Sequence, residues 1–260
     1  MYLLEGMPAP DHATIARFIS LHFSFCAKAL LAQMSDLLYL LGEISGKTIF
    51  IDGTKIESAA NKYTFVWKRA ITKNQTRLYT KLSSFVAECE ELYGIRTVYH
   101  DRISIHTLKR LKKQLCRIKV QDGIVFVHGI GRRKTQLQKS LEQLDQYLEK
   151  LKEYTKKLYT LGDRNSYSKT DPDATFMRMK EDAMLNGQLK PAYNIQHGVD
   201  SEYITWIDIS PRPTDTRTLI PFLKDMESHL GFKYSEIVAD AGYESEENYL
   251  FIEATDRLPI

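Results

Sequence analysis

Two short apolar strands, far apart in the sequence, each end in an aspartate that is followed closely by glycine. Residues 48–51 precede Asp52-Gly, and residues 237–239 precede Asp240-Ala-Gly, and both segments have the composition of buried strands. If the strands are neighbours in one sheet, the two carboxylates lie side by side, where a divalent metal relieves their repulsion. Asp-Gly pairs also form turns at strand ends, so either aspartate alone has this simpler explanation.

The elements around these strands occur in an informative order. Residues 192–199 and 203–210 alternate in polarity and predict an antiparallel hairpin turned by Asp200-Ser-Glu. Helices are expected over residues 216–230, with Pro221 in the first turn, and over residues 246–254. This order is that of an α/β fold with an RNase H-like mixed sheet. Leu258-Pro-Ile260 supplies only the start of the next strand, so the sheet is expected to be incomplete at its C-terminal end.

Further helices are expected outside this core. Asp11 is a suitable N-cap for a helix over residues 12–22, and a second helix over residues 27–41 ends at Gly42. Asp171 and Pro172 predict the start of another helix, which ends at Asn186-Gly187. Capping is therefore a better explanation for the acids around Pro172 than metal ligation.

The charge is strongly segregated along the chain. Residues 62–165 hold 23 Lys/Arg against 10 Asp/Glu, whereas the net charge of the whole chain is only +3. A basic surface attracts polyanions, which makes this block a candidate nucleic-acid-binding region. A solvated helical surface is the alternative explanation.

The basic block is predicted to be a helical hairpin or small bundle. Apolar residues recur at helical spacing from Leu78 to Tyr93 and again from Leu108 to Ile118, which predicts two helices. A third helix carries leucines at alternating spacings of four and three from Leu137 to Leu158, the pattern of a coiled-coil seam. Residues 124–127 are a candidate for a small strand between the last two helices.

Composition excludes several other classes of protein. The hydrophobic content of 43% and the low glycine and proline content indicate a globular chain. Three widely spaced cysteines argue against a disulfide framework or a zinc site and fit a reducing cytosol. The most apolar stretch, residues 23–42, is interrupted by Lys28, Gln33 and Asp36, so we expect a soluble protein without membrane contact.

Five motifs together resemble the DDE transposases of bacterial insertion sequences. They are Ile-Asp52-Gly-Thr-Lys-Ile-Glu57, Asn61-Lys-Tyr-Thr-Phe-Val-Trp67-Lys, Asp171-Pro-Asp-Ala-Thr-Phe-Met-Arg-Met-Lys180, Asn186-Gly-Gln-Leu-Lys-Pro-Ala-Tyr-Asn194 and Val238-Ala-Asp240-Ala-Gly-Tyr-Glu-Ser245. The segment from Asp11 to Phe18 also resembles the end of the helical N-terminal domain of these enzymes. The resemblance predicts four parts: a remnant of that domain (residues 1–45), the first strand of the core (46–61), a basic helical insertion (62–165) and the truncated remainder of the core (166–260).

The resemblance implies that Asp52 and Asp240 are the first two acids of a catalytic triad. They would bind Mg²⁺ or Mn²⁺ for cleavage and transfer of DNA strands, with double-stranded transposon ends and target DNA as partners and a homo-oligomer on the DNA. The family's third acid is a glutamate on a helix beyond the next strand, and Glu244, Glu246, Glu247 and Glu253 come too early to match it. The sequence therefore looks like a fragment, and we expect it to be catalytically inactive by itself. The alternative is a non-catalytic remnant that binds DNA and dimerises.

Two clusters in the basic block are candidate DNA contacts. The first interleaves aromatic and basic residues suited to stacking on bases and holding phosphates, although core packing explains its aromatic members equally well; it comprises Lys62, Tyr63, Phe65, Trp67, Lys68 and Arg69. The second, Arg132-Arg-Lys134, follows two glycines at the start of the leucine-rich helix. No nucleotide-binding loop, zinc-hydrolase motif or nucleophile motif is present. Asp200 and Asp208 are predicted to face solvent.

Overall fold

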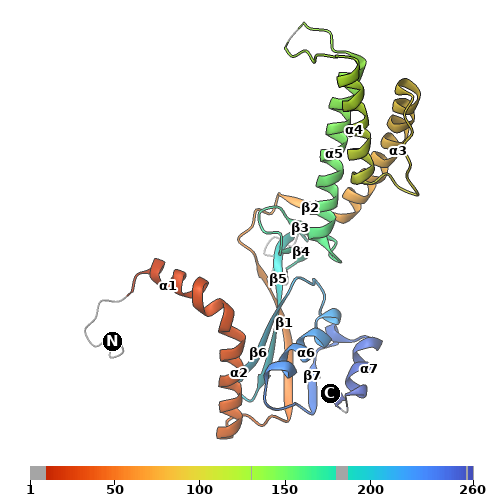
Figure 1. Ribbon diagram of the computed structural model, residues 1–260. Helices are drawn as coiled ribbons and strands as arrows, with labels where there is room; N and C mark the ends of the chain where they lie inside the picture. The colour runs from red at the N-terminus through yellow and green to blue at the C-terminus, as the bar shows by residue number, and fades with distance from the viewer. Residues whose placement is uncertain (1–9, 130, 180–186, 256, 260) are drawn as a thin grey trace. The chain divides into compact units, whose positions relative to one another are not determined.

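The computed structural model describes residues 10–129, 131–179, 187–255 and 257–259 (Figure 1). The chain divides into two compact units. Residues 1–59 and 174–260 form the first, called the sheet unit here, and residues 60–173 form the second, called the helical unit.

The sheet unit is built on a six-stranded mixed sheet with the strand order β4-β5-β1-β7-β8, and β6 also pairs with β5. β1 (Thr48–Glu57) lies antiparallel to β5 (Leu189–Asp200) and parallel to β7 (Glu236–Ala239). β8 (Leu258–Pro259) is parallel to β7, whereas β4 (Thr175–Arg178) and β6 (Tyr203–Ser210) are antiparallel to β5. This α/β arrangement is consistent with the predicted RNase H-like fold, and it confirms that the two acid-bearing strands are neighbours.

Helices cover one face of this sheet. α6 (Leu219–His229), with Pro221 in its first turn as predicted, and α7 (Glu246–Ala254) contribute to a single core around Trp206, Phe222 and Ile237. Ile49 and Ile51 of β1 point into this core, whereas Phe50 between them remains 52% exposed. Because neighbouring residues of a strand point to opposite faces, the face that carries Phe50 is the one that this core does not cover.

The N-terminal segment is one continuous helical stretch rather than the two helices expected. It comprises α1 (His12–Phe18), a π-helical turn (Ile19–Phe23) and α2 (Ser24–Leu41). Asp11 caps it by accepting a hydrogen bond from the Thr14 amide at 2.7 Å, and Gly42 ends it with a φ of 76°. The 30 residues are long and apolar enough to span a membrane, with a mean hydropathy of 1.4 and little burial. Length and composition alone therefore do not exclude a membrane-spanning segment, contrary to the expectation from residues 23–42.

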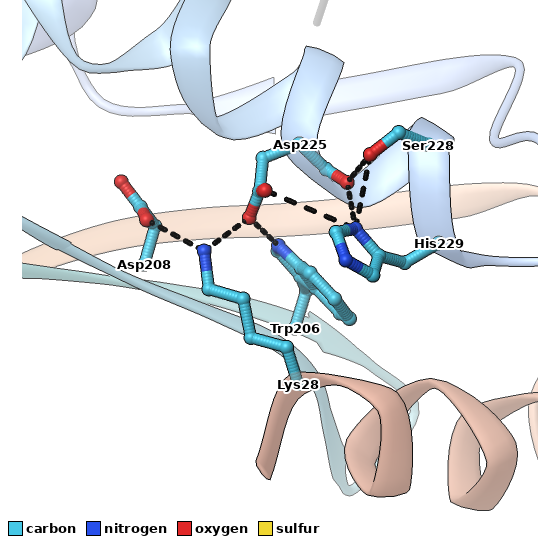
Figure 2. A network of polar contacts seen from close by, with 6 residues as sticks. All are labelled: Lys28, Trp206, Asp208, Asp225, Ser228 and His229. Atoms are coloured by element: carbon cyan, nitrogen blue, oxygen red, sulfur yellow. Dashed lines mark hydrogen bonds and ion pairs between the residues drawn. The ribbon is translucent and has the colours of Figure 1, made fainter. Parts of the chain in front are cut away.

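A polar network joins α2 to the sheet and to α6 (Figure 2). Lys28 Nζ lies 3.2 Å from Asp208 Oδ1 and 2.5 Å from Asp225 Oδ2, and the same Asp225 oxygen accepts a hydrogen bond from Trp206 Nε1 at 3.2 Å. Burial alone would lower the pKa of Lys28, but its hydrogen bonds to the two carboxylates outweigh this effect and raise the pKa. Lys28 therefore remains protonated and bridges the strand and the helix.

The prediction of a helix starting at Asp171 is wrong. Residues 171–174 form a turn, in which Asp171 Oδ1 accepts a hydrogen bond from the Asp173 amide at 3.3 Å, and β4 follows directly. The aspartate thus caps a turn rather than a helix, and the β-prone residues Thr175 and Phe176 continue as a strand. The predicted helix end at Asn186 lies outside the described residues.

The helical unit contains three helices that run alongside one another, α3 (Lys68–Tyr93), α4 (Ile105–Gln121) and α5 (Gln136–Leu161) (Figure 1). The leucines of α5 from Leu137 to Leu151 are buried against α3 and α4, so the predicted seam is filled within the chain itself. A short sheet of β2 (Phe65–Trp67) and β3 (Ser166–Ser168) closes the unit. Residues 124–127 are not a strand, contrary to the prediction, and Ile124 and Phe126 pack against the helices instead.

Candidate active site

Asp52 and Asp240 come from neighbouring parallel strands. Ile51 of β1 is paired with Ala239 of β7, so the next residue of each strand is an aspartate. Asp52 lies inside β1 and is paired with His197 of β5, so the turn explanation does not apply to it. Asp240 does act in a turn, because it caps the 3₁₀ turn Ala241–Tyr243 and accepts a hydrogen bond from the Gly242 amide at 2.9 Å.

The two aspartates line one open depression of about 390 Å³. Its other walls are formed by the apolar and aromatic residues Phe50, Ile51, Val199, Val238 and Ala239, together with His197. Asp52 is exposed and alternates with the buried residues Ile51 and Gly53, which places its side chain on the face of the sheet opposite the helix-covered core. The strand order thus brings the predicted pair of carboxylates to one accessible surface.

A chain of hydrogen bonds lies behind this depression, on the buried side of β1. Asp215 Oδ1 accepts hydrogen bonds from Asn194 Nδ2 at 2.7 Å and from Gln196 Nε2 at 3.1 Å. Tyr243, which follows Asp240 by one turn, donates its hydroxyl proton to Gln196 Oε1. Asp215 belongs to a short 3₁₀ helix, Asp215–Arg217, so the network connects that helix, β5 and the turn that holds Asp240.

Tyr243 is kept neutral by its surroundings. Burial raises the pKa of Tyr243 above its ordinary value of 10.0, and the negative charges of Asp215, Asp52 and Asp240 raise it further. The hydroxyl therefore remains a hydrogen-bond donor at physiological pH, which the acceptor Gln196 Oε1 requires.

Close packing explains why a glycine, Gly53, follows the first aspartate. A Cβ atom at this position would lie 2.7 Å from Gln196 Nε2 and 2.8 Å from Asp215 Oδ1, closer than real Cβ contacts. A side chain here would therefore displace the hydrogen-bond network. Glycine is required at this site for close packing behind the depression and not for a turn.

The donor set suits a hard divalent cation. Mg²⁺ is usually bound by one or two carboxylates, with water and substrate phosphate oxygens as the remaining ligands. Asp52 and Asp240 provide two such carboxylates at an open surface, which fits this mode of binding. Within the described part of the chain, no group of three His, Cys, Asp or Glu side chains is arranged to hold a metal by itself.

Sequence reasoning missed Asp215 and misplaced two other aspartates. Asp200 is only 3% exposed and accepts a hydrogen bond from the Gly46 amide at 2.8 Å, and Asp208 is half-buried against Lys28, so neither faces solvent. Asp200 ends β5 and therefore lies beside the loop before β1 instead of in an open turn. Asp215 follows a Pro-Thr pair just before a helix, a position that suggests capping and gives no signal of a site.

The predicted DNA-contact residues all lie in the helical unit, in two separate places. Lys68 Nζ donates a hydrogen bond to the Gly162 carbonyl at 2.9 Å, which gives it a structural role at the end of α5. In the same cluster, Tyr63 is 71% exposed, and the Lys62 ammonium group lies over its ring. Arg69 is exposed, whereas Trp67 is half-buried. Arg132, Arg133 and Lys134 precede the other end of α5, where Lys134 pairs with Glu142 at 2.6 Å. The length of α5, about 39 Å at 1.5 Å per residue, separates the two clusters.

Comparison with known protein families gives a match for part of the chain. Residues 164–259 match the family described as the transposase DDE domain. The matched segment contains Asp215, Asp240 and Tyr243 and ends within β8. Comparisons with curated proteins and with solved structures gave no match. A transposase DDE domain implies a role in transposition, and such domains generally use divalent metal and bind DNA.

Proposed function

We propose that this chain is the catalytic region of a DDE transposase of a bacterial insertion sequence and acts on DNA in the cytoplasm. The observation that carries the proposal is the convergence of Asp52 and Asp240, from neighbouring parallel strands, on one open depression. The match to the transposase DDE domain supports the same conclusion independently, because it rests on the sequence of residues 164–259.

In this proposal each part of the site has a distinct task. Asp52 and Asp240 bind Mg²⁺ or Mn²⁺, and the open face of the sheet admits a DNA phosphodiester. Bound metal of this kind activates an attacking water or 3′-hydroxyl and stabilises the leaving oxygen. The network of Asp215, Asn194, Gln196 and Tyr243 holds the turn that carries Asp240 against β1.

We further propose that the 260-residue chain binds metal and DNA but does not cleave DNA alone. No described group of three acids is arranged as a complete triad, and this favours a requirement for a further glutamate. The same observation supports the second candidate function, a non-catalytic DNA-binding and dimerising form of a transposase. The two candidates differ in whether Asp52 and Asp240 bind metal.

Calorimetric titration of Mn²⁺ into the purified chain tests the proposal. We expect binding by the unaltered protein, loss of binding in Asp52→Ala and in Asp240→Ala, and unchanged binding in Asp101→Ala, which removes an exposed carboxylate of the helical unit. Equal binding by all four proteins would show that the two strand aspartates are not the metal ligands and would favour the non-catalytic candidate. Metal-dependent nicking of supercoiled plasmid, lost in Asp52→Ala, would contradict the proposed inactivity.

A further inference from the structure

The helical unit has a polar groove between α3 and α5 that none of the predicted DNA contacts occupies. The groove has a volume of about 460 Å³. Its residues form one stripe on each helix, at spacings of three and four, and they are Asn74, Arg77, Leu78 and Lys81 of α3 and Gln143, Gln146, Tyr147, Lys150 and Tyr154 of α5. A second hollow continues it and shares Lys81, Gln143 and Tyr147.

The groove carries positive charge without local neutralisation. Arg77, Lys81 and Lys150 are exposed, and no acid lines the main hollow. Three acids of α5 form ion pairs with lysines outside the groove: Asp145 with Lys112, Glu142 with Lys134 and Glu153 with Lys157. Glu88 is the one acid in the continuation, about 10 Å along α3 from Lys81 at 1.5 Å per residue. The groove therefore places three exposed cations together in an already basic unit.

We infer that this groove binds the phosphate backbone of double-stranded DNA through Arg77, Lys81 and Lys150. Asparagine, glutamine and tyrosine side chains, which line the rest of the groove, are common partners of phosphate oxygens together with Arg and Lys. Arg77 and Lys81 are one helical turn apart, about 6 Å, which is close to the rise of two base pairs at about 3.4 Å each. The inference rests on the proposed transposase function and adds to it a DNA-contact surface whose residues belong to neither predicted cluster.

The floor of the groove is rigid, so the cations are held on a fixed surface. Leu78 is buried in the core of the unit, and Tyr147 packs edge-on against the buried Phe85 with ring centroids 5.3 Å apart. Gln143 donates a hydrogen bond to the Tyr147 hydroxyl at 2.8 Å. Because the charged residues are on the rims and the floor is preformed, their neutralisation should leave the fold intact.

A matched pair of triple variants tests the inference. The groove variant carries Arg77→Gln, Lys81→Gln and Lys150→Gln, and the control carries Lys113→Gln, Arg117→Gln and Lys152→Gln, which removes the same charge at exposed positions that do not line the groove. Binding to a fluorescein-labelled 30-base-pair duplex is measured by anisotropy between 50 and 200 mM salt. Loss of three phosphate contacts should weaken binding about 10- to 100-fold and reduce the slope of log K against log salt by about 2.7, whereas the control should stay within about threefold of the unaltered chain.

The outcomes separate the inference from the proposed function. Equal effects of the two triple variants, with binding by the unaltered chain, would overturn the groove and leave DNA binding elsewhere intact. Absence of binding by the unaltered chain would contradict the proposed function itself. A charge-conserving variant, Arg77→Lys with Lys81→Arg and Lys150→Arg, should restore most of the affinity that the groove variant loses, and its failure to do so would contradict binding through the charges at these positions. If poly-glutamate of equal charge displaced the duplex as well as unlabelled DNA does, the groove would be a general anion site and the inference would be wrong.

Discussion

Asp215 is the residue on which the buried side of the candidate site depends. It accepts hydrogen bonds from two amide side chains that are almost completely buried, Asn194 and Gln196. Buried donors of this kind are costly to leave unpaired. Asp52 of β1, by contrast, is exposed. Asp215 lies against Gly53, the neighbour of Asp52, but substitution of the two aspartates should have different consequences for stability.

Asp215→Ala should lower the free energy of unfolding of the sheet unit by about 1–3 kcal/mol, because it removes the acceptor of the Asn194 amide and one of the two acceptors of the Gln196 amide. Asp215→Asn keeps an acceptor oxygen and should cost much less, and Asp52→Ala should remain within about 0.5 kcal/mol of the unaltered chain. Urea unfolding followed by fluorescence measures all three. Equal stability of Asp215→Ala and Asp52→Ala would show that the network does not support the fold.

At the scale of elements, α2 is fastened to the sheet by a few specific contacts. Lys28 bridges Asp208 of β6 and Asp225 of α6, and Trp206, which is completely buried, donates to Asp225 (Figure 2). Ser35 of α2 adds a hydrogen bond from its hydroxyl to the Thr205 carbonyl at 2.8 Å. Since Lys28 is 46% exposed, solvent screens its ion pairs, whereas the indole hydrogen bond is sheltered.

Asp225→Ala should therefore destabilise the sheet unit more than Lys28→Met does. We expect about 1–3 kcal/mol for the loss of the acceptor of Trp206, and about 1 kcal/mol or less for the loss of the ammonium group. The effect of Lys28→Met should also shrink at 1 M salt, because exposed ion pairs are screened. Chemical denaturation at low and high salt tests this order. A larger cost for Lys28→Met than for Asp225→Ala would contradict this order.

At the scale of the whole molecule, the chain has two units with separate cores. Leu144 is completely buried among α3, α4 and α5, and Phe222 is completely buried in the sheet unit. Each unit also contains one of the two tryptophans, Trp67 in β2 and Trp206 in β6. The fluorescence of single-tryptophan variants can therefore report on each unit independently.

Leu144→Ala should destabilise the helical unit by about 2–5 kcal/mol and Phe222→Ala the sheet unit by about 3–5 kcal/mol, because each leaves a cavity in a packed core. The first substitution should shift the unfolding transition reported by Trp67, and the second the transition reported by Trp206. Variants in which the other tryptophan is replaced by phenylalanine provide the measurement. If both reporters moved together in each variant, the two cores would unfold as one cooperative unit.

Local sequence patterns were enough to predict several elements and to single out the two strand aspartates. Apolar runs that end in Asp52 and Asp240 predicted the two strands, and the leucine spacing predicted α5, because both patterns depend only on local periodicity. The prediction of a helix at Asp171 was wrong because the same capping residues occur at the start of turns and of helices.

The residues around the acid pair could not be predicted in this way, because they come from distant parts of the chain. Asp215 reaches Asn194 and Gln196 across a separation of about 20 residues, and Arg77 and Lys81 share a groove with Lys150 on another helix. Such contacts depend on strand order, register and helix packing, which bring distant segments together and leave no periodic trace in either one. The two strands and their aspartates could therefore be predicted from local sequence, whereas the supporting network and the basic groove required the fold.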